Sequence, residues 1–212
     1  MTGTRRGRPR TPLLSRESIV AATLQVIDAE GTAAVGMRSV ARALGVDAKS
    51  LYNHVDGKDG LLDAVTEHLL GGLDLPSPTG DARHDLRAIA DSFRDQALKH
   101  PQAAPLVLTR QLASLRALAP VDAVLAVLRD AGAGTEEAVH MLRMLLATLI
   151  GTLLREVSAA PAFGSNDRED TLAASGLPAL VDAAEHLARF DREAEYEYAV
   201  DLAIGAVLHR LG

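Results

Sequence analysis

With 212 residues, the chain is long enough for one large hydrophobic core or two small ones. Its hydrophobic content of 48% and mean hydropathy of +0.08 indicate a folded protein. Cysteine is absent, which excludes disulfides, zinc–thiolate sites and iron–sulfur clusters. Aromatic residues make up only 3% of the chain, so we expect a core built mainly from alanine, leucine and valine.

The charge is unevenly distributed. The net charge is −6, yet residues 1–65 hold nine Lys and Arg against seven Asp and Glu, whereas the remaining 147 residues hold 13 against 21. The first sixteen residues contain five arginines and no acid. This asymmetry favours contact between the N-terminal end and a polyanion such as nucleic acid.

Membrane insertion is not expected from the sequence. No N-terminal stretch has the apolar core of a signal peptide. The most apolar run, Met144–Leu154, is interrupted by Gly151 and predicts a segment too short to span a bilayer. We therefore expect a soluble, cytoplasmic protein without a membrane partner.

The first elements in chain order are helices. Ile19, Thr23 and Ile27 follow the i, i+4, i+8 spacing of a helix that Ser15 can cap and Gly31 can end.

Three short helices are predicted to follow. The first spans Met37–Leu44, and the second spans Ala48–His54 behind Asp47 as the N-cap. Asp56 and Asp59 flank the start of the third, whose apolar stripe is Leu61, Leu62, Val65 and Leu69.

A connector rich in Pro, Gly and Ser, Gly72–Asp81, is the best domain boundary. With a flexible basic arm at residues 1–15, the chain is thus divided into an N-terminal domain at residues 16–71 and a C-terminal domain at residues 81–212. In the C-terminal domain the spacing predicts helices over Asp81–Lys99, after Pro101, from Pro120 to Gly132, from Thr135 onward, and over Pro178–Ala188 and Asp191–Leu211. Ala160–Ser175 has weak periodicity and is predicted to be a mobile loop. No segment alternates as a strand does, so the predicted fold class is all-α.

The stretch from Met37 to His54 has the proportions of a helix-turn-helix. Gly45 stands where a left-handed turn residue is needed, and Val46 and Leu51 can serve as apolar anchors. Several polar residues remain for the outer face, namely Lys49, Ser50, Tyr52, Asn53 and His54. Such side chains can bind base edges and phosphates in a major groove.

The same stretch resembles the TetR family of bacterial regulators. The family pattern is matched by RSVARALGV, which begins at Arg38, and by LYNHVDGKDGLL, which begins at Leu51. The resemblance implies a three-helix helix-turn-helix domain followed by a helical ligand-binding and dimerisation domain. It also implies a double-stranded DNA operator as partner, a homodimer, and release from DNA by a small molecule.

Roles at the DNA follow from the resemblance. Arg38 is expected to reach a base or phosphate, while the residues expected to face bases are Lys49, Ser50 and Asn53. Those expected to hold the backbone are Tyr52, His54 and Lys58. Two alternatives stay open, because His54 can be a packed or solvent-edge residue and Tyr52 can be partly core with its hydroxyl at the rim.

The N-terminal arm, Arg5–Arg10, contains Gly-Arg-Pro and resembles the core of an AT-hook. Arg6 and Arg8 are therefore candidates for a narrow A·T-rich minor groove. The alternative is a disordered basic tail that attracts phosphates without specificity.

The C-terminal domain shows a weaker resemblance to the members of the family that bind tetracycline with magnesium. Ile89, Val107, Asp74 and Arg155 stand at the positions where those members hold the drug and the metal, and they do not match. We therefore expect a mainly apolar effector, with an acidic group as an option, and neither a metal nor a cofactor. The predicted lining is Ile89, Phe93, Val107, Met144 and Leu146, with Arg143 or Arg155 to bind an acidic group. Exposed ion pairs are the alternative for both arginines.

Two other classes of function have to be considered. An enzyme requires a nucleophile, an acid–base pair or a metal cluster, and the sequence contains no HExxH, P-loop, GxGxxG or GxSxG motif. A helical adaptor that has lost DNA binding is the remaining alternative. For the operator-binding homodimer, the predicted interface is a four-helix bundle formed by the long helices from Thr135 to Ala160 and from Asp191 to Leu211.

Overall fold

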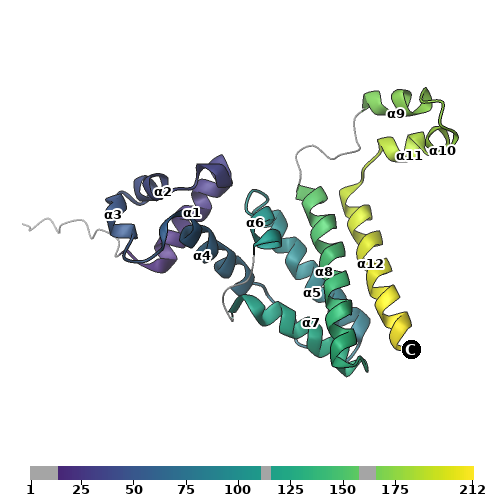
Figure 1. The fold of residues 1–212 in the computed structure, drawn as a ribbon, viewed down its shortest axis with the longest axis horizontal. Coiled ribbons are helices and arrows are strands. Elements are labelled where there is room, and N and C mark those ends of the chain that lie inside the picture. Colours follow the sequence, from purple (N-terminus) through teal and green to yellow (C-terminus); the bar gives the residue numbers. More distant parts are fainter. Residues whose placement is uncertain (1–13, 111–115, 158–165) are drawn as a thin grey trace, which may run out of the picture. The chain divides into compact units, whose positions relative to one another are not determined.

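The computed structural model describes residues 14–110, 116–157 and 166–212. The chain folds into two compact units, Met1–Val65 and Thr66–Gly212, so the boundary falls within one helix. Every regular element in the described ranges is a helix, which confirms the all-α prediction (Figure 1).

The first unit starts with α1 (Arg16–Glu30) and a 3₁₀ turn, η1 (Thr32–Ala34). Ser15 caps α1 as predicted: its Oγ accepts from the Ser18 backbone N–H at 3.2 Å, and the Ser18 Oγ accepts from the Ser15 N–H at 2.9 Å. The predicted inward face of α1 is buried. These local signals therefore fix the first helix.

The next two helices are joined by a tight turn. α2 (Met37–Leu44) has the predicted bounds, and Gly45 follows it in the left-handed conformation, with φ 68° and ψ 30°. The Asp47 carboxylate accepts from the Lys49 N–H at 2.8 Å and caps α3 (Ala48–Leu51).

α3 is shorter than the predicted Ala48–His54, which is a correction. After Leu51 the backbone tightens into i→i+3 hydrogen bonds, from the Tyr52 N–H to the Lys49 carbonyl and from the His54 N–H to the Leu51 carbonyl, at 3.3 and 2.9 Å. Such a turn often replaces the last turn of a helix.

A compact core holds these elements together. α4 (Gly57–Gly71) follows α3, and each of the four helices α1 to α4 contributes fully buried side chains. They include Ile19, Thr23, Ile27, Val40, Leu51, Leu61 and Val65.

The second unit contains the remaining helices. Their bounds are α5 (Ala82–Lys99), α6 (Ala104–Thr109), η2 (Arg116–Leu118), α7 (Ala119–Asp130), α8 (Thr135–Val157), α9 (Asn166–Ala173), α10 (Pro178–Asp182), α11 (Ala184–Ala188) and α12 (Arg192–Leu211). Asp81 and Asp191 act as N-caps for α5 and α12, each through its carboxylate.

The core of the second unit lies among α5, α7, α8 and α12. α8 and α12 lie side by side and run antiparallel (Figure 1). Ion pairs at both ends agree with this arrangement, since Glu137 pairs with Arg210 and Arg155 with Glu195. α5 packs against α7, α8 and α12.

Residues 166–173 form α9, so the prediction of a loop over Ala160–Ser175 is wrong for this part, while residues 158–165 lie outside the described ranges. α9 packs against α10 and α11, and such tertiary packing can stabilise a helix whose own periodicity is weak. The predicted helix Pro178–Ala188 is likewise two short helices, because Ala183 has φ −92° and ψ 0° between them.

α8 is longer than the apolar run Met144–Leu154, from which a segment too short to span a bilayer was predicted. With 23 residues it is long and apolar enough to span a bilayer by length and composition, and it is the one such helix in the described ranges. Buried core helices of soluble proteins meet the same criterion. One side of α8 is buried, and its buried residues include the acidic Glu156.

Candidate DNA-reading surface and apolar cavity

The helix-turn-helix, from α2 to the turn that follows α3, presents a group of polar side chains. Arg38 and Lys49 are exposed, Ser50 is half-buried, and Tyr52 is 61% exposed. Asn53 and His54 are exposed as well. We call Arg38, Lys49, Ser50, Tyr52, Asn53 and His54 the reading cluster.

The reading cluster is held from beneath by apolar anchors. Leu51 is completely buried and Val55 is 8% exposed, whereas Val46 is only half-buried. Because Leu51 and Val55 lie on the inner side of the turn, the polar residues between them face outward. This arrangement is suited to the insertion of the exposed polar side chains into a groove of DNA.

Lys58, at the start of α4, is exposed and has a partner within its own unit. Its ammonium donates to the Ala33 carbonyl at 3.2 Å, which links α4 to η1. An ammonium has three donors, so this bond leaves capacity for a phosphate oxygen. Arg6 and Arg8 of the basic arm lie outside the described residues.

An apolar cavity lies in the second unit among α5, α7, α8 and α12. It leaves about 50 Å³ open to the centres of water molecules. Its walls are almost entirely aliphatic, and Thr148 is the polar exception among the lining residues. The lining is Leu86, Ile89, Ala90, Phe93, Pro120, Val121, Val124, Leu142, Leu145, Leu146, Thr148, Leu149, Val200, Ala203 and Ile204. We call this space the main cavity.

A smaller cavity lies beside it, also within the second unit. Phe93 lines both cavities, and Val107 lines the smaller one. The smaller cavity also has polar side chains in its wall, Gln96 and His100. Phe93 is therefore shared by the walls of the two cavities.

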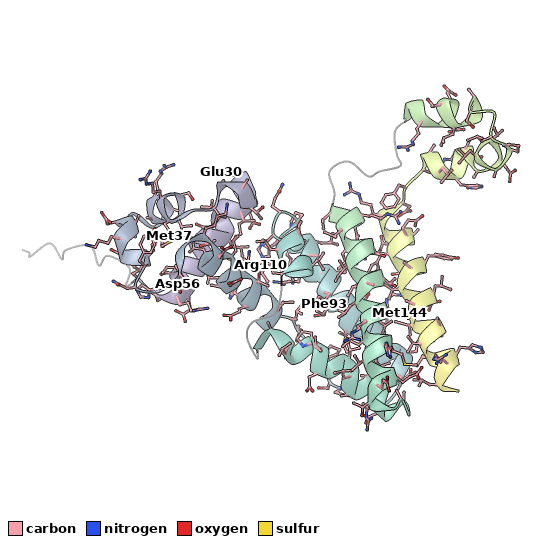
Figure 2. All side chains as sticks on the ribbon, in the orientation of Figure 1. Glu30, Met37, Asp56, Phe93, Arg110 and Met144 are labelled. Carbon is pink, nitrogen blue, oxygen red and sulfur yellow. The ribbon has the colours of Figure 1, made fainter. Side chains whose placement is uncertain are left out.

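The structure divides the predicted ligand set. Ile89, Phe93 and Leu146 line the main cavity, while Arg143 and Met144 do not. Met144 is 37% exposed and lines a shallow groove with Ala206 on the outer side of α8 and α12; Figure 2 labels Phe93 on α5 and Met144 on α8.

Neither predicted arginine reaches the main cavity. Arg143 is exposed on α8. Arg155 lies 3.9 Å from a carboxylate oxygen of Glu195, and its guanidinium lies 4.9 Å from the centre of the Phe190 ring. The alternative interpretation of Arg155 as an exposed ion pair describes these contacts.

Sequence reasoning missed a partly buried polar network in the second unit. Arg94 binds Glu156 through both carboxylate oxygens, with its Nη2 at 2.7 Å and its Nε at 3.0 Å from Oε1. The Arg94 guanidinium also lies 4.6 Å from the centre of the buried Tyr196 ring. The Tyr196 hydroxyl donates to Asp91 at 2.8 Å, and burial together with this bond raises the pKa of Tyr196. The network ties α5, α8 and α12 together.

No group of three or more His, Asp or Glu side chains in the described ranges is arranged to hold a metal ion. The main cavity is lined almost entirely by carbon, so it suits the binding of apolar molecules. The chain thus combines a helix-turn-helix with exposed polar residues and a helical unit with an apolar cavity. That combination is typical of DNA-binding proteins that sense a small molecule.

Comparisons with known proteins agree with this class. The model for bacterial regulatory proteins of the tetR family matches residues 19–65, and that for the tetracyclin repressor-like C-terminal domain matches residues 75–208. The chain belongs to the TetR family of transcriptional regulators. Members of this family are non-enzymatic DNA-binding transcription factors, which confirms the prediction that the protein is not an enzyme.

Individual relatives span most of the chain. An HTH-type transcriptional regulator of Saccharopolyspora erythraea is 34% identical over 200 residues, covering 87% of this chain and 83% of the relative. The class E tetracycline repressor of Escherichia coli is 26% identical over 191 residues, covering 88% and 87%. The crystal structure of Streptomyces coelicolor ActR in complex with (S)-DNPA has a TM-score of 0.83 and 25% identity, covering 94% of this chain and 99% of ActR.

Proposed function

We propose that this regulator is a repressor that binds a palindromic operator as a homodimer and leaves it when a mainly apolar small molecule binds. The observation that carries the proposal is the presence, in one chain, of an exposed reading cluster and an apolar cavity among helices. The names of relatives support repression, since one of them is a tetracycline repressor. A cytoplasmic location is part of the proposal, because the operator is there.

At the operator, Asn53, Ser50 and Lys49 are assigned to base edges and Arg38 to a base or a phosphate. Tyr52, His54 and Lys58 are assigned to the backbone, with Lys58 as a point charge beside a phosphate. One short reading element covers only a few base pairs, so useful specificity requires two copies on two half-sites.

The dimer is assigned to the outer faces of α8 and α12. On α8, Met144 and the small residues Ala147 and Gly151 are exposed at a spacing of three and four residues. On α12, Tyr198 and Leu202 are 71% and 60% exposed. Apolar stripes on two adjacent antiparallel helices suit a four-helix bundle across a two-fold axis, which would cover them.

The effector is assigned to the main cavity. Aliphatic walls favour apolar guests, and the lack of oxygen donors at Ile89 and Val107 disfavours a hydrated magnesium chelate. Since Arg143 and Arg155 lie away from the cavity, an acidic group on the effector has no cationic partner among the lining residues of this cavity. A mainly apolar, neutral guest therefore fits best.

Selection of DNA from a random pool by the purified protein tests the proposal. The expected product is a palindrome whose half-site centres are about one helical turn apart, roughly 34–36 Å. Native mass spectrometry of the complex should give two chains per duplex. Failure to enrich any sequence at low salt would instead support an adaptor without DNA binding.

A further inference from the structure

The connector between α4 and α5, Leu73–Gly80, is attached to α5. Asp85 is a buried carboxylate on α5, and both of its oxygens accept from the Thr79 backbone N–H at 3.0 Å. The Thr79 hydroxyl donates to Asp85 Oδ1 at 2.7 Å, and the Gly80 N–H donates to Oδ2 at 3.2 Å. These hydrogen bonds, that of the Thr79 hydroxyl above all, lower the pKa of Asp85.

A second attachment lies two helical turns further along α5. The Ser92 hydroxyl donates to the Asp74 carbonyl at 3.0 Å. Between the two attachments, Leu75 packs against the core, and Leu73, just before the second attachment, lines the smaller cavity. The connector is therefore fixed to α5 at both of its ends.

The same helix forms a wall of the main cavity. Leu86, Ile89, Ala90 and Phe93 are α5 residues that line it. Asp85 and Ser92 are seven residues apart and share one face of α5, next to the face that carries Ile89 and Phe93. A displacement of α5 by a guest in the cavity must therefore act directly on the connector that leads back to α4.

We propose that Asp85 and Ser92 are positioning residues that transmit occupancy of the main cavity to α4 through the connector. The proposal rests on the proposed function and adds a route by which the cavity acts on the DNA-binding unit. A competing route is direct packing, because Leu69 and Leu70 in the last turn of α4 line the smaller cavity with Phe93 and Ala97 of α5. The two routes differ in whether the hydrogen bonds to the connector are needed.

A substitution inside the cavity can serve as the probe, so no effector has to be known. Ala203 of α12 lines the main cavity and is 8% exposed, and Ala203→Phe adds a ring where a guest would bind. Ala126→Phe on α7 is the control, since Ala126 is exposed and does not line the cavity. Operator affinity is measured on the full chain by fluorescence anisotropy with the DNA selected by the wild type.

The expected result is a double-mutant cycle with strong coupling. Ala203→Phe should weaken operator binding by about ten-fold or more, and Ala126→Phe by less than about two-fold. The combined variant Asp85→Asn, Ser92→Ala should bind the operator within about three-fold of the wild type and should reduce the effect of Ala203→Phe to less than about three-fold.

Controls keep the outcome clear. Asp81→Ala removes the side-chain cap of α5 without removing the bonds to the connector, so it should leave the effect of Ala203→Phe intact. If the Asp85→Asn variant does not fold, the combined variant Thr79→Val, Ser92→Ala is used in its place. If the Ala203→Phe variant does not fold, Ala203→Val is used in its place.

If Ala203→Phe weakens operator binding as much in the connector variant as in the wild type, the proposal is wrong and direct packing is the route. If Ala203→Phe has no effect on operator binding in the wild type, the proposal is wrong as well. Failure of the proposed function is distinguishable, because the wild type would then select no operator at all.

Discussion

The reading cluster and the main cavity differ in where their side chains lie. In the cluster most functional side chains are exposed, as Tyr52 at 61% shows, and two buried residues, Leu51 and Val55, hold their position. In the cavity the functional side chains are themselves the buried core, as Ile89 at 6% shows. Substitutions in the cluster should therefore change DNA recognition at constant stability, whereas substitutions in the cavity should change both binding and folding.

The largest effect on stability is expected for Leu51, a buried anchor of the reading cluster, and not for its exposed residues. Leu51→Ala removes a completely buried side chain and should lower the free energy of unfolding of the first unit by about 2–5 kcal/mol, with loss of operator binding. Thermal unfolding followed by circular dichroism checks the stability. Tyr52→Ala is the matched control at the next position, and an equally large loss of stability there would contradict the division into anchor and surface.

A second substitution tests the outer stripe of α8 and α12. Leu202→Glu places a charge on an exposed position, so the isolated chain should change in stability by less than about 0.5 kcal/mol. Burial of that charge in a dimer should weaken association by about 3 kcal/mol, or roughly a hundred-fold. Light scattering at micromolar concentration should give a monomer for Leu202→Glu and a dimer for the wild type and for Ala126→Glu. A wild-type monomer would remove the basis for two half-sites.

Within the cluster, base contacts and phosphate contacts should separate. Asn53→Ala should relax the preference at one base position by about 1–3 kcal/mol. Lys58→Ala should weaken binding to all sequences alike and reduce the slope of log affinity against log salt by about one. Affinities for single-base operator variants at several salt concentrations distinguish the two. A change of base preference in Lys58→Ala, without one in Asn53→Ala, would reverse the assigned roles.

The smallest expected effect is on the pH dependence of stability, through the carboxylate of Asp85. Because hydrogen bonds lower the pKa of Asp85 below its ordinary value of 3.8, its carboxylate stabilises the fold above that value, and the contribution is lost as the pH falls through the lowered pKa. The difference in melting temperature between the wild type and Asp85→Asn should therefore be constant from about pH 7 to 5 and shrink below about pH 4. A difference that grows on acidification would contradict this sign.

Local signals explain why the first unit was predictable. Ser15, Gly45 and Asp47 act on neighbours within a few residues, so their roles are visible in sequence, and the burial of Leu51 follows from spacing. The length of α3 was overestimated because a 3₁₀ turn and a helix end have similar sequence patterns.

The second unit depends on contacts between distant residues. Arg94 and Glu156 are 62 positions apart, and Tyr196 and Asp91 are 105 apart, so no spacing rule brings them together. The same limit explains why spacing along α8 predicted both Met144 and Leu146 as lining residues, whereas Leu146 lines the main cavity and Met144 does not. The helices themselves followed from periodicity, apart from α9, which packs against α10 and α11.

Operator release is the measurement that tests the central claim most directly, since it requires the reading cluster and the cavity to act in one molecule. The selected operator, bound to the wild type, is titrated with neutral and acidic apolar compounds, with (S)-DNPA, and with tetracycline in the presence and absence of magnesium. The account predicts release by an apolar compound and none by magnesium–tetracycline at micromolar concentration. Release by magnesium–tetracycline, or operator binding that no apolar compound changes, would contradict it.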